Sequence, residues 1–184
     1  LSEACAQDSA AYKAGYKTIP EIAKHRIRLA AREINAASKL KGQEVHLDTG
    51  FRVFRQDSSN MKDVFYSPDQ TDKNSLFSMV DNVKPERTAI DLLFQVLVDW
   101  GLELSLPVTE LQICGLDVSF VDENALAACF ASNGEISEAF CKELAARKPL
   151  RVIFRDSGFK DDSVKINAEQ IFKLMSPHTE IKCL

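Results

Sequence analysis

The stretch Pro85–Leu106, PERTAIDLLFQVLVDWGLELSL, decides the fold expected for this chain. Its apolar central part holds three polar residues spaced four apart: Asp91, Gln95 and Asp99. With Arg87, that spacing places them in one narrow stripe on a helix whose remaining surface is apolar. A solvent-facing helix is apolar on one side only. The stretch therefore predicts a helix packed on nearly all sides, either at the centre of the core or with its second face against another chain.

Beyond Gly101 the hydrophobic period changes from that of a helix to that of strands. Alternating residues around Gly115 predict a β-hairpin, and short apolar runs predict further strands at 125–130, 150–155 and 180–184. Amphipathic patterns predict helices over 137–147 and 167–175. The order β-β-β-α-β-α-β predicts an α/β or α+β fold. We expect a mixed sheet of about five strands, with the long apolar helix and two shorter helices packed on it, preceded by a helical arm.

The arm is a basic, amphipathic helix. Thr18-Ile19-Pro20-Glu21 predicts a helix start, and the helix is expected to run to about Leu40 and to stop at Gly42. Lys24, Arg28 and Arg32 follow at four-residue spacing, with Arg26 close by in the sequence. Aligned cations of this kind can neutralise a nucleic-acid backbone, so these four residues are candidate DNA contacts. Two other interpretations stay open: a solvated face, or a face docked on an acidic neighbouring domain.

Between the arm and the central helix the sequence is less regular. Residues 50–55 alternate as a short strand, residues 57–60 have the composition of a turn, and residues 67–75 are polar and contain proline. We therefore expect three segments: a helical tail at 1–44, an irregular connector at 45–83 and a compact C-terminal domain at 84–184.

Composition and charge are those of an ordinary globular protein. The chain has 184 residues, 45% of them hydrophobic, and a net charge of −4, which gives no overall nucleic-acid signature. The charge is uneven, because residues 13–41 carry eight Lys or Arg against Glu21 and Glu33. The five scattered cysteines lack metal-site spacing, which favours a reduced cytoplasmic protein. No apolar run reaches the roughly 20 residues of a membrane span.

Catalytic motifs are absent from the sequence, and the three histidines are isolated. Two acidic features remain as hypotheses. Asp156, Asp161 and Asp162 follow the clearest strand and could hold a hard cation, or could form a solvated turn in which Asp156 caps. With Asp156, the Glu180–Lys182 pair resembles the carboxylate-plus-lysine set of metal-dependent nucleases, although a helix intervenes where that pattern usually has a hairpin.

The aromatic residues of the central helix favour packing over base stacking. Trp100 lies among Leu and Val residues, whereas stacking on bases needs exposed rings beside basic side chains. Because the helix has more apolar surface than one core face requires, we expect part of it to form an interface, through Phe94, Leu97 and Trp100.

Several long strings resemble one protein family. They are AYKAGYKTIPEIAKHRIRLA (11–30), GFRVFRQDSSNMK (50–62), IDLLFQVLVDWGLELSLPV (90–108), ALAACF (125–130) and KPLRVIFRDSGFKDDSVKINAEQIFKLMSP (148–177). Together they resemble the C-terminal portion of the modification subunits of type III restriction-modification systems. These subunits methylate adenine at N6 in DNA with S-adenosylmethionine, and the resemblance covers nearly the whole chain in the family's order.

The resemblance implies a fragment of a bacterial, cytoplasmic DNA methyltransferase. The family's catalytic Asp-Pro-Pro-Tyr motif and Phe-x-Gly-x-Gly cofactor loop do not occur here, so no catalytic, cofactor or metal residue is carried over and the fragment is expected to be inactive. Leu1–Cys5 resembles the segment after the cofactor strands, with Ser2 where the family usually has proline. The implied partners are DNA, a second modification subunit and a restriction subunit, with assembly assigned to the region from about residue 84.

Overall fold

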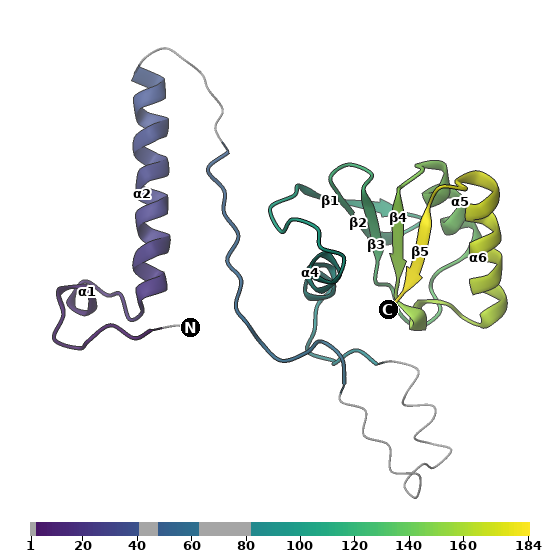
Figure 1. The fold of residues 1–184 in the computed structure, drawn as a ribbon, viewed down its shortest axis with the longest axis horizontal. Helices are drawn as coiled ribbons and strands as arrows, with labels where there is room; N and C mark the ends of the chain where they lie inside the picture. Colours follow the sequence, from purple (N-terminus) through teal and green to yellow (C-terminus); the bar gives the residue numbers. More distant parts are fainter. Residues whose placement is uncertain (1–2, 41–47, 63–81) are drawn as a thin grey trace, which may run out of the picture. The chain divides into compact units, whose positions relative to one another are not determined.

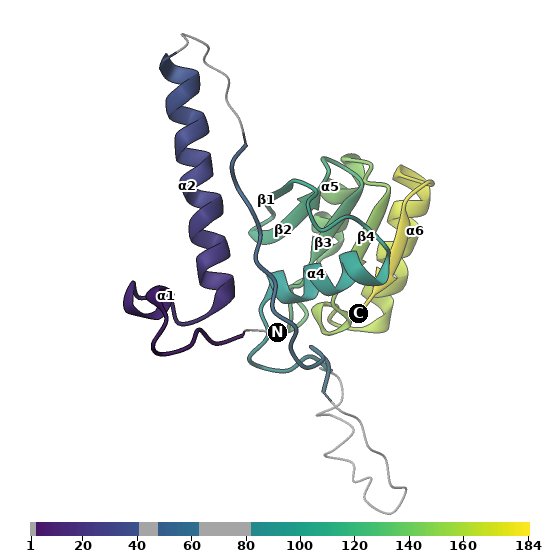
Figure 2. The ribbon, with the colours of Figure 1, turned by 60° about the vertical axis from the view of Figure 1, so that its left-hand side comes forward.

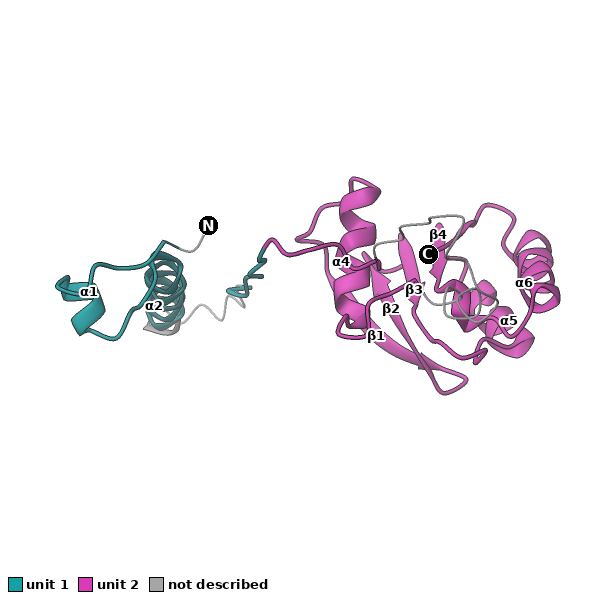
Figure 3. Ribbon diagram, turned by 90° about the horizontal axis from the view of Figure 1, so that it is seen from below, with its two compact units in different colours: residues 1–55 teal, residues 56–184 magenta. Residues whose placement is uncertain are grey.

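The computed structural model describes residues 3–40, 48–62 and 82–184. The chain divides into two compact units, Leu1–Arg55 and Gln56–Leu184 (Figure 3). The division falls inside the segment 45–83 that we expected to connect two domains. The second unit therefore begins well before the central helix.

The first unit consists mainly of α2 (Ile19–Leu40), preceded by the single turn of α1 (Ala10–Lys13) (Figure 1). The Glu21 carboxylate accepts hydrogen bonds from the backbone N–H groups of Lys17 (2.7 Å) and Thr18 (3.3 Å). This is the carboxylate half of a capping box, so the helix begins where the sequence indicates. The stop expected at Gly42 lies outside the described residues.

The strand predicted at residues 50–55 is wrong. The backbone there has no strand assignment, and among the described residues no strand pairs with it. Alternation of apolar and polar residues favours an extended backbone, but a strand forms only where a partner satisfies its N–H and C=O groups. Phe51, Val53 and Phe54 are 36–56% exposed as a result.

The second unit is built on a five-stranded mixed sheet, which confirms the predicted mixed α/β class. Its strands lie in sequence order: β1 (Val108–Ile113), β2 (Leu116–Val121), β3 (Leu126–Cys129), β4 (Arg151–Phe154) and β5 (Glu180–Cys183). The first three strands are antiparallel, and β3, β4 and β5 are parallel. Cys114 and Gly115 join β1 to β2 with φ of 48° and 84°, as a type I′ turn requires.

Helices cover both faces of the sheet (Figure 2). The helices α5 (Glu138–Ala146) and α6 (Asp162–Met175) pack on one face, whose core includes Phe140, Phe154 and Phe172. The helix α4 (Ala89–Asp99) packs on the other face, against Val121, Leu126 and Ile153 among others. A short 3₁₀ turn, η2 (Asp156–Gly158), links β4 to α6.

The central helix is shorter than expected and is not buried all round within this chain, so it is not the centre of the core; the alternative, that its second face meets another chain, stays a prediction. α4 has 11 residues against 14 for α6. Its buried side chains, Leu92, Leu93, Val96 and Leu97, lie on one side, whereas Ile90 and Val98 are 44% and 61% exposed. The exposed side of α4 could not be predicted from the sequence, because Ile90 and Val98 are of a residue type usually found in the core but face away from the sheet.

None of the described helices combines the length and the apolar character needed to cross a membrane.

Candidate interaction surfaces

The basic residues of α2 form a ridge without Arg26. Lys24, Arg28 and Arg32 are four residues apart and lie within an arc of about 80°, whereas Arg26 is about 200° round the helix from Arg28. Lys24 is half-buried, and Arg28 and Arg32 are exposed. The Arg28 guanidinium lies 5.6 Å from the centre of the Phe51 ring. We call Lys24, Arg28 and Arg32 the basic ridge.

Arg26 belongs instead to the apolar side of α2. It lines an open groove with Glu33 and four apolar neighbours: Ala23, Ile27, Leu29 and Ala30. Ile19, Ile27 and Ile34 on this side are 47–50% exposed. Where burial is described, no residue of the first unit is buried. The apolar side of α2 therefore has no partner within the first unit as far as that unit is described, although an amphipathic helix is stabilised mainly by burying that side.

The three residues predicted at the α4 interface have different environments. Leu97 is fully buried in the core of its own chain, so it offers no surface to a partner. Phe94 is half-buried against the same core. The outward apolar surface of α4 is instead made by Ile90 and Val98 beside Phe94, at four-residue spacing.

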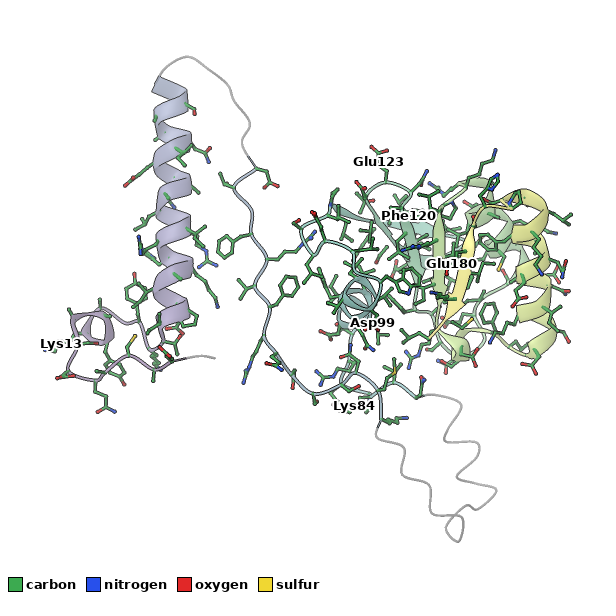
Figure 4. All side chains as sticks on the ribbon, viewed as in Figure 1. Lys13, Lys84, Asp99, Phe120, Glu123 and Glu180 are labelled. Atoms are coloured by element: carbon green, nitrogen blue, oxygen red, sulfur yellow. The ribbon has the colours of Figure 1, made fainter. Side chains whose placement is uncertain are left out.

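Trp100 is half-buried and lies against two cations of the sheet. The Arg151 guanidinium and the Lys182 ammonium are 5.3 and 4.9 Å from the indole ring. Glu180 bonds both cations, at 3.3 Å from Arg151 and 3.1 Å from Lys182. Figure 4 shows Glu180 on β5 and Asp99 at the end of α4. This network covers the β4–β5 part of the sheet face that carries α4, and it accounts for both charged residues of β5.

The acidic residues after β4 serve the local fold. Asp156 pairs with Lys165, and Asp161 caps α6 by accepting a hydrogen bond from the Val164 N–H (3.0 Å). Asp156 and Glu180 are therefore held by different cations. No group of three His, Cys, Asp or Glu residues suited to a metal ion occurs in the described ranges.

The topology of the sheet also disfavours a ligand crevice at its carboxyl edge. In open α/β sheets, ligands bind where successive crossover helices diverge to opposite faces. Here β3, β4 and β5 lie in sequence order, and both crossover helices, α5 and α6, pack on the same face. No such divergence exists between these strands.

One polar contact surface was missed by sequence reasoning. The segment 57–62, which we call the strap, binds Arg87, two residues before α4, and the polar side of the helix at Asp91 and Gln95. The Arg87 guanidinium donates to Asp57 Oδ2 (3.1 Å), to Ser58 O (3.1 Å) and to Ser58 Oγ (2.8 Å). The Asn60 amide donates to Asp91 O (3.0 Å) and Gln95 Oε1 (2.8 Å).

The base of the strap is closed by backbone bonds. Met61 and Val83 form an antiparallel bridge, with N–H groups of Lys62 and Lys84 donating to Asn82 O and Asn60 O. The narrow polar stripe of Arg87, Asp91 and Gln95 is therefore the surface on which the strap packs, and the strap lies some 30 residues earlier in the chain. In the sequence, the four-residue spacing of Arg87, Asp91 and Gln95 was the only sign of this contact.

Two of the groups with shifted pKa values, Asp91 and Cys141, show what holds the second unit together. Thr88 donates to the Asp91 carboxylate from its hydroxyl (2.7 Å) and its backbone N–H (2.8 Å), and these bonds lower the pKa of Asp91. Burial raises the pKa of the Cys141 thiol to about 12. Asp91 therefore stays ionised as a helix cap, and Cys141 stays protonated as a small apolar core residue.

No model of a known protein family matches this chain, and no curated protein matches it either.

Proposed function

We propose that this chain is the non-catalytic assembly portion of a type III DNA adenine-N6 methyltransferase, the modification subunit of a bacterial restriction-modification system. The resemblance of its long sequence strings to that family supports the proposal. The second unit, an α/β sheet with a hydrophobic core on each face, also agrees with it. In this proposal the parent enzyme works in the cytoplasm with S-adenosylmethionine, while this portion holds subunits together and has no cofactor of its own.

The observation that carries the proposal is the unpartnered apolar side of α2. Ile19, Ile27 and Ile34 are each about half exposed, and burying the rest of each contributes roughly 1 kcal/mol. A helix with this pattern is suited to pack on a surface outside the first unit. A methyltransferase sheet provides such a surface, which agrees with residues 1–44 being the tail of that domain.

Supplying the chain in trans tests the proposal. A type III modification subunit lacking the matching C-terminal portion should recover adenine methylation when this chain is added, and the two should co-elute. Replacing Ile27 and Ile34 with Asp should abolish both effects. Ala36→Gln, at an exposed position of α2 on the side away from Ile27 and outside the basic ridge, is the matched control and should preserve them. Failure of the wild-type chain to associate would overturn the proposal.

A second candidate function is binding to the DNA backbone through the basic ridge. The exposure of Arg28 and Arg32 within one arc favours it. A titration with duplex DNA at two salt concentrations tests it, because each phosphate contact contributes to the salt slope. Charge reversal of Arg28 and Arg32 should weaken binding and flatten that slope. An unchanged slope would exclude the ridge as the DNA contact.

A further inference from the structure

The two edges of the sheet differ in how they are protected against strand pairing. Natural edge strands are kept short, or carry charges, prolines or bulges, because their free N–H and C=O groups otherwise pair with another strand. β5 has four residues, and its Glu180 and Lys182 carry opposite charges. β1 has six residues, a continuous register with β2 and Glu110 as its sole charged residue.

The outer edge of β1 is free along the described part of the chain. Four successive residues are exposed: Thr109, Glu110, Leu111 and Gln112. Among the described residues, no strand other than β2 pairs with β1, and no backbone hydrogen bond outside that ladder involves it. Figure 1 shows β1 as the outermost strand at one side of the sheet.

The direction of each backbone group of β1 follows from one hydrogen bond. The Asp122 N–H donates to Pro107 O at 2.9 Å, and the β1–β2 register makes these residues direct partners. Hydrogen-bonded pairs alternate along an antiparallel ladder, so the amides of Thr109 and Leu111 point to β2. The amides of Glu110 and Gln112 therefore point outward.

The sequence of β1 is self-complementary about Leu111. In an antiparallel pair of two β1 strands with a two-fold axis at Leu111, Glu110 of one chain lies opposite Gln112 of the other, and the outward amides form about four backbone hydrogen bonds. The two Leu111 side chains, each 42% exposed, then meet directly. Moving the axis to Glu110 opposes two carboxylates, which is unfavourable.

We propose that two copies of this chain pair through β1 about Leu111, which joins their sheets into one of ten strands. Open sheets reach about this size, and a two-fold contact of one surface with itself is the commonest symmetry of homodimers. The inference rests on the proposed assembly function, for which a second copy is already an expected partner, and adds the surface and the register through which the two copies pair.

Amide hydrogen exchange on the full chain, combined with sedimentation, tests this pairing. The mass should rise from the 20.5 kDa of one chain to twice that value with concentration. Over the same range the amides of Glu110 and Gln112 should become at least about 10-fold more protected. The amides of Thr109 and Leu111 serve as an internal control, because β2 protects them in the monomer as well.

Leu111→Lys should raise the dissociation constant at least about 10-fold, since it opposes two ammonium groups and removes an apolar contact. Leu174→Lys is the control, because Leu174 is 84% exposed on α6 and should leave dimerisation unchanged. A chain that stays monomeric while Glu110 and Gln112 exchange freely overturns the pairing. That outcome leaves the complementation test of the proposed function untouched, so the two failures are distinguishable.

Discussion

Replacing Arg87 with alanine should destabilise the second unit by detaching the strap from α4. The Arg87 side chain is only 12% exposed and donates three hydrogen bonds to Asp57 and Ser58. The bond to Asp57 adds little, because that carboxylate is 67% exposed and screened by water. The two bonds to Ser58 contribute about 1 kcal/mol each, and the buried aliphatic stem adds a similar amount. Removing the Nε of Arg87, which is buried without a hydrogen-bond partner, offsets part of this sum, so we expect a loss of roughly 1–2 kcal/mol.

Urea unfolding followed by circular dichroism measures this change directly, as a lower midpoint at nearly constant slope. Lys84→Ala is the matched control, because Lys84 makes one exposed hydrogen bond to the same Ser58 hydroxyl (3.2 Å). It should change the free energy of unfolding by less than about 0.5 kcal/mol. A loss below about 0.5 kcal/mol for Arg87→Ala would mean that the strap adds nothing to stability, and the division at Arg55–Gln56 would lose its physical basis.

Three further predictions concern the second unit. Asp91→Asn should lower the free energy of unfolding by about 1 kcal/mol near neutral pH, because it weakens the capping box with Thr88. Since the pKa of Asp91 is lowered in the folded state, the difference should be full above the unfolded pKa and vanish as pH falls through the folded pKa. A pH-independent difference in the free energy of unfolding would contradict this. Glu143→Gln should speed the reaction of Cys114 with a disulfide reagent severalfold at mildly alkaline pH, since the hydrogen bond to Glu143 raises the pKa of that thiol; an unchanged rate would refute this cause. Phe154→Ala should cost about 3–5 kcal/mol in urea unfolding, because this ring is fully buried among three other phenylalanines, and a cost below about 1 kcal/mol would show that the core collapses around the gap.

The second unit was predictable from sequence where local signals agree. The hairpin at Gly115 needed only a tight turn between alternating residues, and the order of strands and helices after Gly101 is confirmed. Ser137 caps α5 by accepting a hydrogen bond from the Phe140 N–H, as expected for a helix starting there. The sequence predicts the start of α6 at Asn167, but the helix begins at Asp162. Asp161 caps its first turn, whose polar residues are equally typical of a loop.

Long-range polar contacts could not be predicted. The local sequence is the same for a polar stripe that faces water and for one that binds another segment. The hydrogen bond between Asn60 and Gln95 could therefore not be predicted. The same limit applies to Trp100, whose neighbours Arg151 and Lys182 come from strands far along the chain. Helical geometry could have separated Arg26 from the basic ridge, because a residue two positions from Arg28 lies on another side of the helix.

The most direct test of the central claim is amide hydrogen exchange along α2. If its apolar side has no partner within the chain, the amides of α2 should exchange at least about 100-fold faster than those of β3 and β4 in the isolated chain. They should slow markedly when the truncated modification subunit is added. Protection of α2 equal to that of β3 and β4 in the isolated chain would contradict the claim, because the helix would then already be packed without any other protein.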